Sequence, residues 1–144
     1  MPGIAPWVAV EPNKNSAAIL GVLPFRQGSV TFKIPTTVVP VGATGILVFA
    51  WAILTGENAP FAYWHFISLA GAQRRNWFSL LVAGDPAGQS ITCNSEAFWL
   101  PMPVDRNLTV TLFANDLPSS INQGEVEIHG YYPAPIRRER ARRR

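Results

Sequence analysis

The sequence has little of the chemistry on which enzymes and metal sites depend. Its 144 residues include one cysteine, Cys93, and two histidines, His65 and His129. A lone cysteine excludes a disulfide bridge within the chain, and these three residues are too far apart in sequence to form a recognisable zinc-ligand spacing. No calcium-loop spacing links the aspartates either. We therefore expect neither a metal ion nor another cofactor.

Motifs for nucleophilic and acid–base catalysis are absent as well. The serines lie in no Gly-x-Ser-x-Gly motif, and no glycine-rich stretch has the spacing of a phosphate-binding loop. Cys93 has no basic neighbour in sequence to activate its thiol, so we expect a small buried residue. His65 stands between aromatic residues in an expected strand, where a histidine is usually structural. The sequence predicts a protein without catalytic residues, not an enzyme.

Charge is scarce and unevenly distributed. Only 15% of the residues are charged. Positions 1–136 carry six basic and eight acidic residues, whereas positions 137–144 carry six arginines and one glutamate. The body thus has a net charge of −2 and the last eight residues one of +5, which together give the overall +3. The high isoelectric point is a property of the C-terminal tail and not of the globular body.

The sequence also lacks long segments suited to helices. Thirteen prolines and eleven glycines are scattered along it, which favours many short strands joined by turns. A chain of this size fits one domain that buries roughly 68–70% of its unfolded surface. We expect an all-β protein: a single-domain antiparallel β-sandwich, most like a jelly roll, over residues 1–132. Residues 133–144 are expected to form a proline-containing spacer and an arginine-rich C-terminal tail.

The longest apolar run, Gly45–Thr55, predicts the central strand of this sandwich. Its large odd-numbered and smaller even-numbered side chains predict a strand that is buried on both faces, with Phe49 and Trp51 in the core. The uncharged stretch 34–56 is also long enough to cross a bilayer. Because prolines and glycines break its first half, a buried strand is the better interpretation and no membrane span is expected.

Shorter apolar segments between turn signals predict the remaining strands, eight or nine in all. In the last of them, Val126 and Ile128 should point inward, with both glutamates and His129 in water. Residues 98–103 are expected to be an ordered connection. The expected core contains Phe32, Phe49, Trp51, Val110, Leu112 and Ile128. Besides the central strand, strands are expected at 7–10, 17–23, 29–34, 61–69, 77–82, 90–94, 106–113 and 125–129.

One class of function that fits this composition is a ligand- or carbohydrate-binding (lectin-like) sandwich. Tryptophan rings can stack on sugars, and loop amides and carboxylates can supply hydrogen bonds. The alternative for these residues is that the tryptophans fill the core and the polar side chains bond nearby backbone. The residues of this candidate ligand site are Asn94, Trp99, Asp105, Asn115 and Asp116.

A structural or assembly role is the favoured class. A body with so few charges and many aromatic residues is expected to leave apolar surface that another copy covers, in a homo-oligomer or a larger lattice. A small jelly roll joined to a basic arm resembles viral shell and virion decoration proteins in architecture and charge layout. In those proteins the basic arm is more often N-terminal, and here it is C-terminal.

The tail supplies the candidate binding element. Arginine clusters bind phosphates and carboxylates through charge and bidentate hydrogen bonds. We therefore expect the tail to bind a neighbouring subunit, another acidic surface or a nucleic-acid backbone. The N-terminus has no signal-peptide pattern, so synthesis in the cytoplasm is expected, with incorporation into a virion for a shell protein. The residues of this candidate site are Arg137, Arg138, Arg140, Arg142, Arg143 and Arg144.

Overall fold

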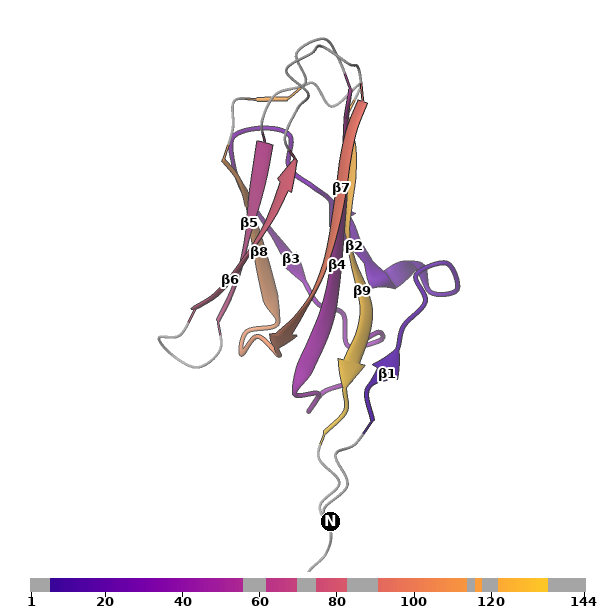
Figure 1. Ribbon diagram of the computed structural model, residues 1–144. Helices are drawn as coiled ribbons and strands as arrows, with labels where there is room; N and C mark the ends of the chain where they lie inside the picture. The colour runs from indigo at the N-terminus through magenta and orange to yellow at the C-terminus, as the bar shows by residue number, and fades with distance from the viewer. Residues whose placement is uncertain are drawn as a thin grey trace, which may run out of the picture.

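The computed structural model of the protein describes residues 6–55, 62–69, 75–82, 91–113, 116–117 and 122–134. These residues form two antiparallel sheets packed face to face, so the prediction of an all-β sandwich is confirmed (Figure 1). The predictions for Asn115 and for the arginines of residues 137–144 lie outside the described residues.

The two sheets divide the strands between them, with five strands in sheet A and four in sheet B. Sheet A has the order β1-β9-β4-β7, and β2 pairs with the same edge of β9 as β1; sheet B has the order β3-β8-β5-β6. A 3-10 helix, η1 (Ser16–Ala18), leads into β2. The strands are β1 (Val8–Ala9), β2 (Ile19–Val22), β3 (Gly28–Lys33), β4 (Gly45–Thr55), β5 (Ala62–Leu69), β6 (Arg75–Val82), β7 (Ile91–Pro101), β8 (Asn107–Leu112) and β9 (Gln123–Tyr132).

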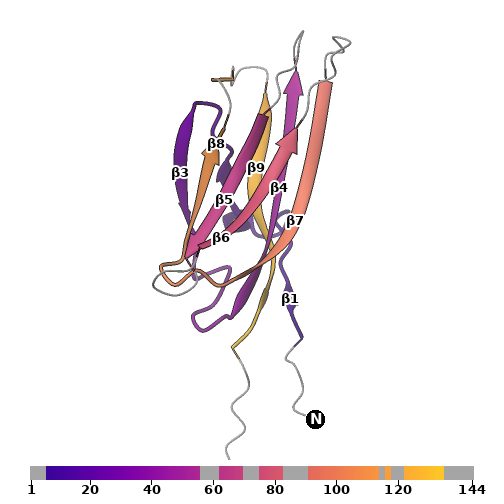
Figure 2. The ribbon, with the colours of Figure 1, turned by 60° about the vertical axis from the view of Figure 1, so that its left-hand side comes forward.

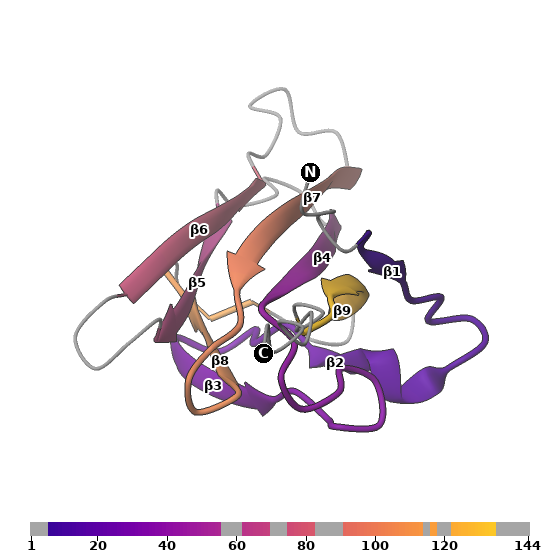
Figure 3. The ribbon, with the colours of Figure 1, turned by 90° about the horizontal axis from the view of Figure 1, so that it is seen from below.

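Viewed from below, the sandwich shows its two layers in cross-section (Figure 3). On one side β6 runs beside β7, and on the other β2 lies beside β3. Four of the strand pairs are nested in sequence: β5 with β6, β4 with β7, β3 with β8, and β2 with β9. The described chain begins and ends at the same end of the sandwich, because β1 pairs with the last residues of β9 (Figure 2).

The central strand has the predicted bounds, but its faces differ from the prediction. The core side of β4 is formed by its smaller residues, all fully buried, and the large odd-numbered residues are half-buried on the outside of sheet A. The prediction that Phe49 and Trp51 lie in the core was therefore wrong. The inward residues of β4 are Ile46, Val48, Ala50, Ala52 and Leu54.

The smaller residues of β4 face the core because large rings of sheet B occupy the space opposite them. Strand β5 sends Trp64 and Phe66 into the core, both fully buried, and the Trp64 Nε1 donates a hydrogen bond of 2.9 Å to the Pro24 carbonyl. Facing sheets lie only about 10 Å apart, so bulky rings on one side leave room for small side chains on the other. Ala50 and Ala52 fit this requirement. The other expected core residues, Phe32, Val110, Leu112 and Ile128, are buried as predicted.

Two other predictions need correction. Residues 90–94 and 98–103 were expected to be a short strand and a separate connection, but β7 is one strand of eleven residues, paired with β4 from Ile91 to Pro101. Pro101 is tolerated because it ends an edge strand, where a missing N–H donor costs little. A strand was expected at 17–23, but residues 17 and 18 belong to η1 and the strand β2 covers only Ile19–Val22.

Within the uncharged stretch 34–56, residues 34–44 connect β3 to β4 and residues 45–55 form β4. Within the described ranges, no helix has the length and apolar character needed to cross a membrane.

Candidate functional site

The outer surface of sheet A carries a continuous group of large apolar side chains, which we call the aromatic face. Alternation along β4 turns its odd-numbered residues outward, and antiparallel register sets Leu47 opposite Trp99 on β7 and Phe49 opposite Glu127 on β9. These side chains are half-buried or exposed, so they form a surface and not a second core. The aromatic face consists of Trp7, Leu47, Phe49, Trp51, Ile53, Trp99 and Tyr132.

At the lower end of this face, three rings form a cluster. Trp7 meets Trp99 edge to face with ring centroids 5.6 Å apart, and Trp99 meets Tyr132 at 4.7 Å. Trp7 lies over Gly130, where a β-carbon would come within 2.8 Å of its ring. Trp7 and Trp99 nevertheless remain 46% and 38% exposed. Two large indole rings that stay this accessible are suited to contact another surface.

A β-bulge in β9 shapes the middle of the face. The register passes from Leu47 opposite Gly130 to Val48 opposite Ile128, which leaves His129 as an extra residue. The His129 ring stacks on Phe49 with centroids 4.5 Å apart and planes inclined by 19°. The bulge also returns Tyr132 to the outer side, where it reaches Trp99. The bulge therefore brings His129 and Tyr132, residues of opposite parity, onto one face.

Beside these rings lie two polar groups with poor partners. The Glu127 carboxylate is 3.8 Å from the Nε2 of His129, too far for a hydrogen bond, and its side chain is only 14% exposed. The His129 Nε2 is buried and has no hydrogen-bond partner. Both residues lie on the outer side of β9 as predicted, but the expectation that Glu127 stands in water was wrong, since only 14% of its side chain is exposed. Only a small part of the Glu127 side chain thus meets solvent, and the His129 ring lies beside it.

The charges of the strands differ between the two sheets. Sheet A strands contain Glu96, Glu125 and Glu127 and no lysine or arginine. Sheet B strands contain Lys33 and Arg75 and no acidic residue. Among the described residues, neither Glu125 nor Glu127 forms an ion pair with a lysine or an arginine. The lysine–carboxylate pair found there joins Lys14 to Glu11. The aromatic face is thus flanked by negative charge.

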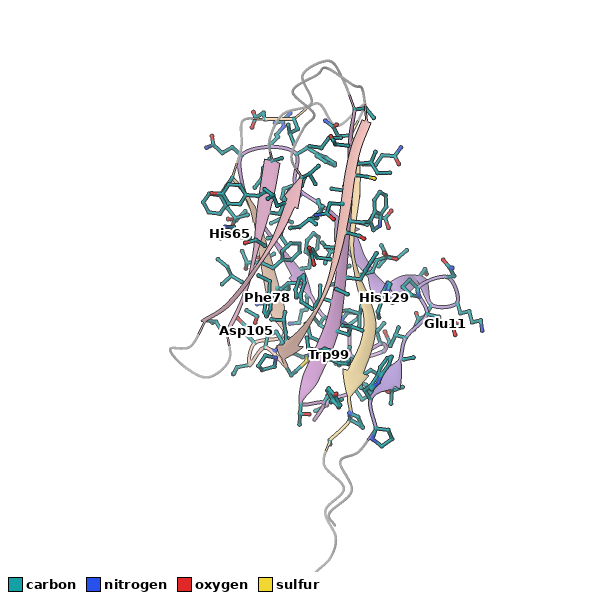
Figure 4. All side chains as sticks on the ribbon, in the orientation of Figure 1. Glu11, His65, Phe78, Trp99, Asp105 and His129 are labelled. Atoms are coloured by element: carbon teal, nitrogen blue, oxygen red, sulfur yellow. The ribbon has the colours of Figure 1, made fainter. Side chains whose placement is uncertain are left out.

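The structure does not bring the expected ligand-binding residues together. Trp99 belongs to the aromatic face, whereas Asp105 lines a shallow pocket with Ile67 and Thr109 on sheet B (Figure 4). Asp105 Oδ1 accepts a hydrogen bond of 3.0 Å from the Asn107 N–H. Trp99 thus lies on the outer side of sheet A, whereas Asp105 lies in the turn that precedes β8 of sheet B.

The two remaining described candidates also bond backbone. Asp116 Oδ1 accepts from the Gln27 N–H at 2.6 Å. Asn94 sits where β7 runs beside β6 and donates from Nδ2 to the Leu81 carbonyl at 2.8 Å. Each of these side chains thus joins two segments of the chain through a backbone hydrogen bond.

The histidines and the cysteine do not form a catalytic group. His65 projects from sheet B among aromatic rings, 4.5 Å from the ring of Phe113, and His129 projects from sheet A (Figure 4). Cys93 was expected to be buried but is exposed, because its position in β7 turns it outward opposite Ile53. In the part of the chain that the structure describes, no three His, Cys, Asp or Glu side chains gather as metal ligands.

Comparison with models of known protein families and with curated protein sequences found no match.

Proposed function

We propose that this protein is a non-enzymatic structural subunit that self-associates through the aromatic face. The observation that carries the proposal is the half-exposed run of Leu47, Phe49, Trp51 and Ile53 along the middle strand of sheet A. The rings of Trp7, Trp99 and Tyr132 extend this run at its lower end. A contiguous exposed apolar surface is typical of an interaction site.

The order of the strands supports assigning the sandwich to the jelly rolls. Four nested antiparallel pairs, from β5–β6 out to β2–β9, are the pattern of one long folded-back ribbon. Wrapping such a ribbon adds the contacts of β4 with β9 and of β5 with β8. Jelly rolls occur in both viral capsid and lectin domains, so the fold alone does not choose between assembly and sugar binding.

The site features favour assembly over the lectin-like alternative. A sugar site needs polar groups that converge beside a stacking ring, and the described candidates instead bond backbone groups on separate parts of the sandwich. The aromatic face is broad and follows whole strands, which suits a second protein surface. We therefore propose a shell or decoration subunit of the kind that viruses assemble.

The proposal is tested by measuring the size of the protein in solution. Sedimentation velocity of the wild type at micromolar concentration should show a dimer or a larger species. Trp99→Ala should dissociate it, because interface tryptophans contribute strongly to binding. Phe113→Ala is the matched control: Phe113 is 44% exposed, close to the 38% of Trp99, but lies on the sheet B side. A monomeric wild type that retains a defined glycan would overturn the proposal in favour of the lectin-like alternative.

A further inference from the structure

We infer that the arginine-rich tail of one copy, residues 137–144, docks on the aromatic face of a second copy, where its guanidinium groups pair with Glu125 and Glu127. This inference rests on the proposed self-association and names the segment that completes the interface. Both carboxylates lack a lysine or arginine partner among the described residues. The tail carries a net +5, against three glutamates and no basic residue on the strands of sheet A.

The surroundings of the two carboxylates match a guanidinium group better than a simple cation. Register sets Glu127 opposite Phe49 and Glu125 opposite Trp51, so each carboxylate lies next to an aromatic ring. Arginine can stack its plane on a ring while its N–H groups reach a carboxylate in a fork. Glu127 is only 14% exposed, so an incoming arginine would pair with a carboxylate that is already largely shielded from solvent.

The spacing of the glutamates in β9 matches the spacing of the arginines in an extended tail. Glu125 and Glu127 are two residues apart in β9 and both face outward. In an extended tail, Arg138, Arg140 and Arg142 also recur every second residue. Both series then repeat at about 6.8 Å along their chains, so consecutive arginines can face consecutive glutamates. The intervening Glu139 and Ala141 would point away from the face.

The direction of the chain favours a neighbouring copy over the same copy. At the end of β9 the Tyr132 carbonyl accepts a hydrogen bond of 2.9 Å from the Thr44 N–H, which fixes the exit of the chain. Pro133 and Pro135 follow, and a residue before a proline is biased toward extended conformations. To reach its own Glu127 the tail would have to reverse direction within this stiff spacer. A second copy placed beyond this end of sheet A would receive the tail without such a reversal.

The experiment uses the full-length chain and two variants. The face variant, Glu125→Gln with Glu127→Gln, removes both carboxylates without changing side-chain size. The tail variant, Arg138→Gln with Arg140→Gln and Arg142→Gln, removes the alternating arginines. Each variant alone is expected to weaken self-association roughly tenfold or more, as losing close interfacial charge pairs does. Circular dichroism checks that both variants keep the sandwich.

Matched controls remove the same charge elsewhere. The control Glu11→Gln with Glu96→Gln removes two carboxylates outside the aromatic face. Glu11 is exposed beside Lys14. Glu96 is paired with the inward-facing Ala50 in the β4–β7 register, so it does not point to the aromatic face. Lys14→Gln with Arg26→Gln and Lys33→Gln removes three exposed positive charges from the body. Both controls are expected to change association by less than about twofold, since exposed charges contribute little.

Mixing the two variants decides where the tail docks. The face variant supplies intact tails and the tail variant supplies intact faces. When the two variants carry different fluorescent labels and are mixed in equal amounts, energy transfer should therefore show that clearly more than half of the pairs are mixed. The preference should fall with added salt. If only half of the pairs are mixed, as random pairing gives, the inference is overturned, because docking of the tail within one copy predicts this result.

The remaining outcomes separate this inference from the proposed function. If the tail variant associates as the wild type does, the inference is overturned while self-association stands. If that variant loses only binding to a non-specific RNA, the tail is a nucleic-acid element, and the inference is again overturned. A wild type that is monomeric under all conditions removes both the proposed function and the inference.

Discussion

His129 stacks on Phe49 because it is the extra residue of the bulge in β9, inserted between two residues that face consecutive positions of β4. Gly130 lies opposite Leu47 and Ile128 opposite Val48, so the strand on either side of His129 is already in register. His129 is in this sense an addition to a regular strand. This geometry gives the first prediction.

Deleting His129 should leave the sandwich folded, because every other residue of β9 keeps its face. The cost should be about 2 kcal/mol, measured by urea denaturation, because the deletion removes the ring contact with Phe49 and the 2.9 Å hydrogen bond from the Val10 N–H to the His129 carbonyl. Deleting Glu127 instead should destabilise far more, since the shift turns Ile128 outward and His129 toward the core. Equal costs for the two deletions would contradict the bulge.

The two faces of β4 should respond differently to truncation. Ile46 is fully buried and Leu47 is half-buried on the aromatic face, although the two side chains are of similar size. Ile46→Ala should lower the free energy of unfolding by about 2–5 kcal/mol, because it leaves a cavity. Leu47→Ala should cost clearly less in the monomer. A larger loss for Leu47→Ala would show that the outward face is a core in solution.

Gly130→Ala should disturb the lower end of the aromatic face. The added β-carbon would lie 2.8 Å from the Trp7 ring and 3.0 Å from the Val8 carbonyl oxygen, so Trp7 and β1 must move. We expect a loss of about 1–3 kcal/mol, typical of overpacking, and a shift of tryptophan fluorescence toward solvent. An unchanged spectrum and stability would mean that Trp7 does not cover Gly130.

Cys93 should react in the native protein. Its thiol is exposed and lines a pocket with Trp51 and Ile53, at the upper part of the aromatic face. One thiol per chain should be titrated by Ellman's reagent without denaturant. Attaching a bulky maleimide should weaken self-association, and association should in turn slow the labelling. Reaction only after unfolding would contradict the outward orientation of β7.

Much of the fold follows from local patterns in the sequence. The alternation in β3 and β8 and the apolar run of β4 located those strands closely, because each pattern depends on a single chain segment. The faces of β4 could not be derived in this way. Both of its parities are apolar, and the choice between them depends on Trp64 and Phe66 of the opposite sheet. A packing constraint of that kind is not local.

The candidate site was predictable only in part. The scarcity of charge indicated an apolar surface, and Trp99 was identified, though as a sugar-stacking residue. The pairing of Glu127 with His129 depends on the bulge, and strand alternation gives no signal for an inserted residue. The separation of acidic and basic residues between sheets was also hidden, because it depends on which strands share a sheet.

The pairing of β1 with the end of β9 gives the domain a direction. Val8 lies opposite Tyr131, so the described chain enters and leaves the sandwich at the same end. In a shell whose subunits all share one orientation, that end of every domain would face the same side. Such a shell would sort fused cargo to its interior or to its exterior according to that orientation. The junction of the two ends is also a natural place to close the chain, so that a permuted form could open at the far loops.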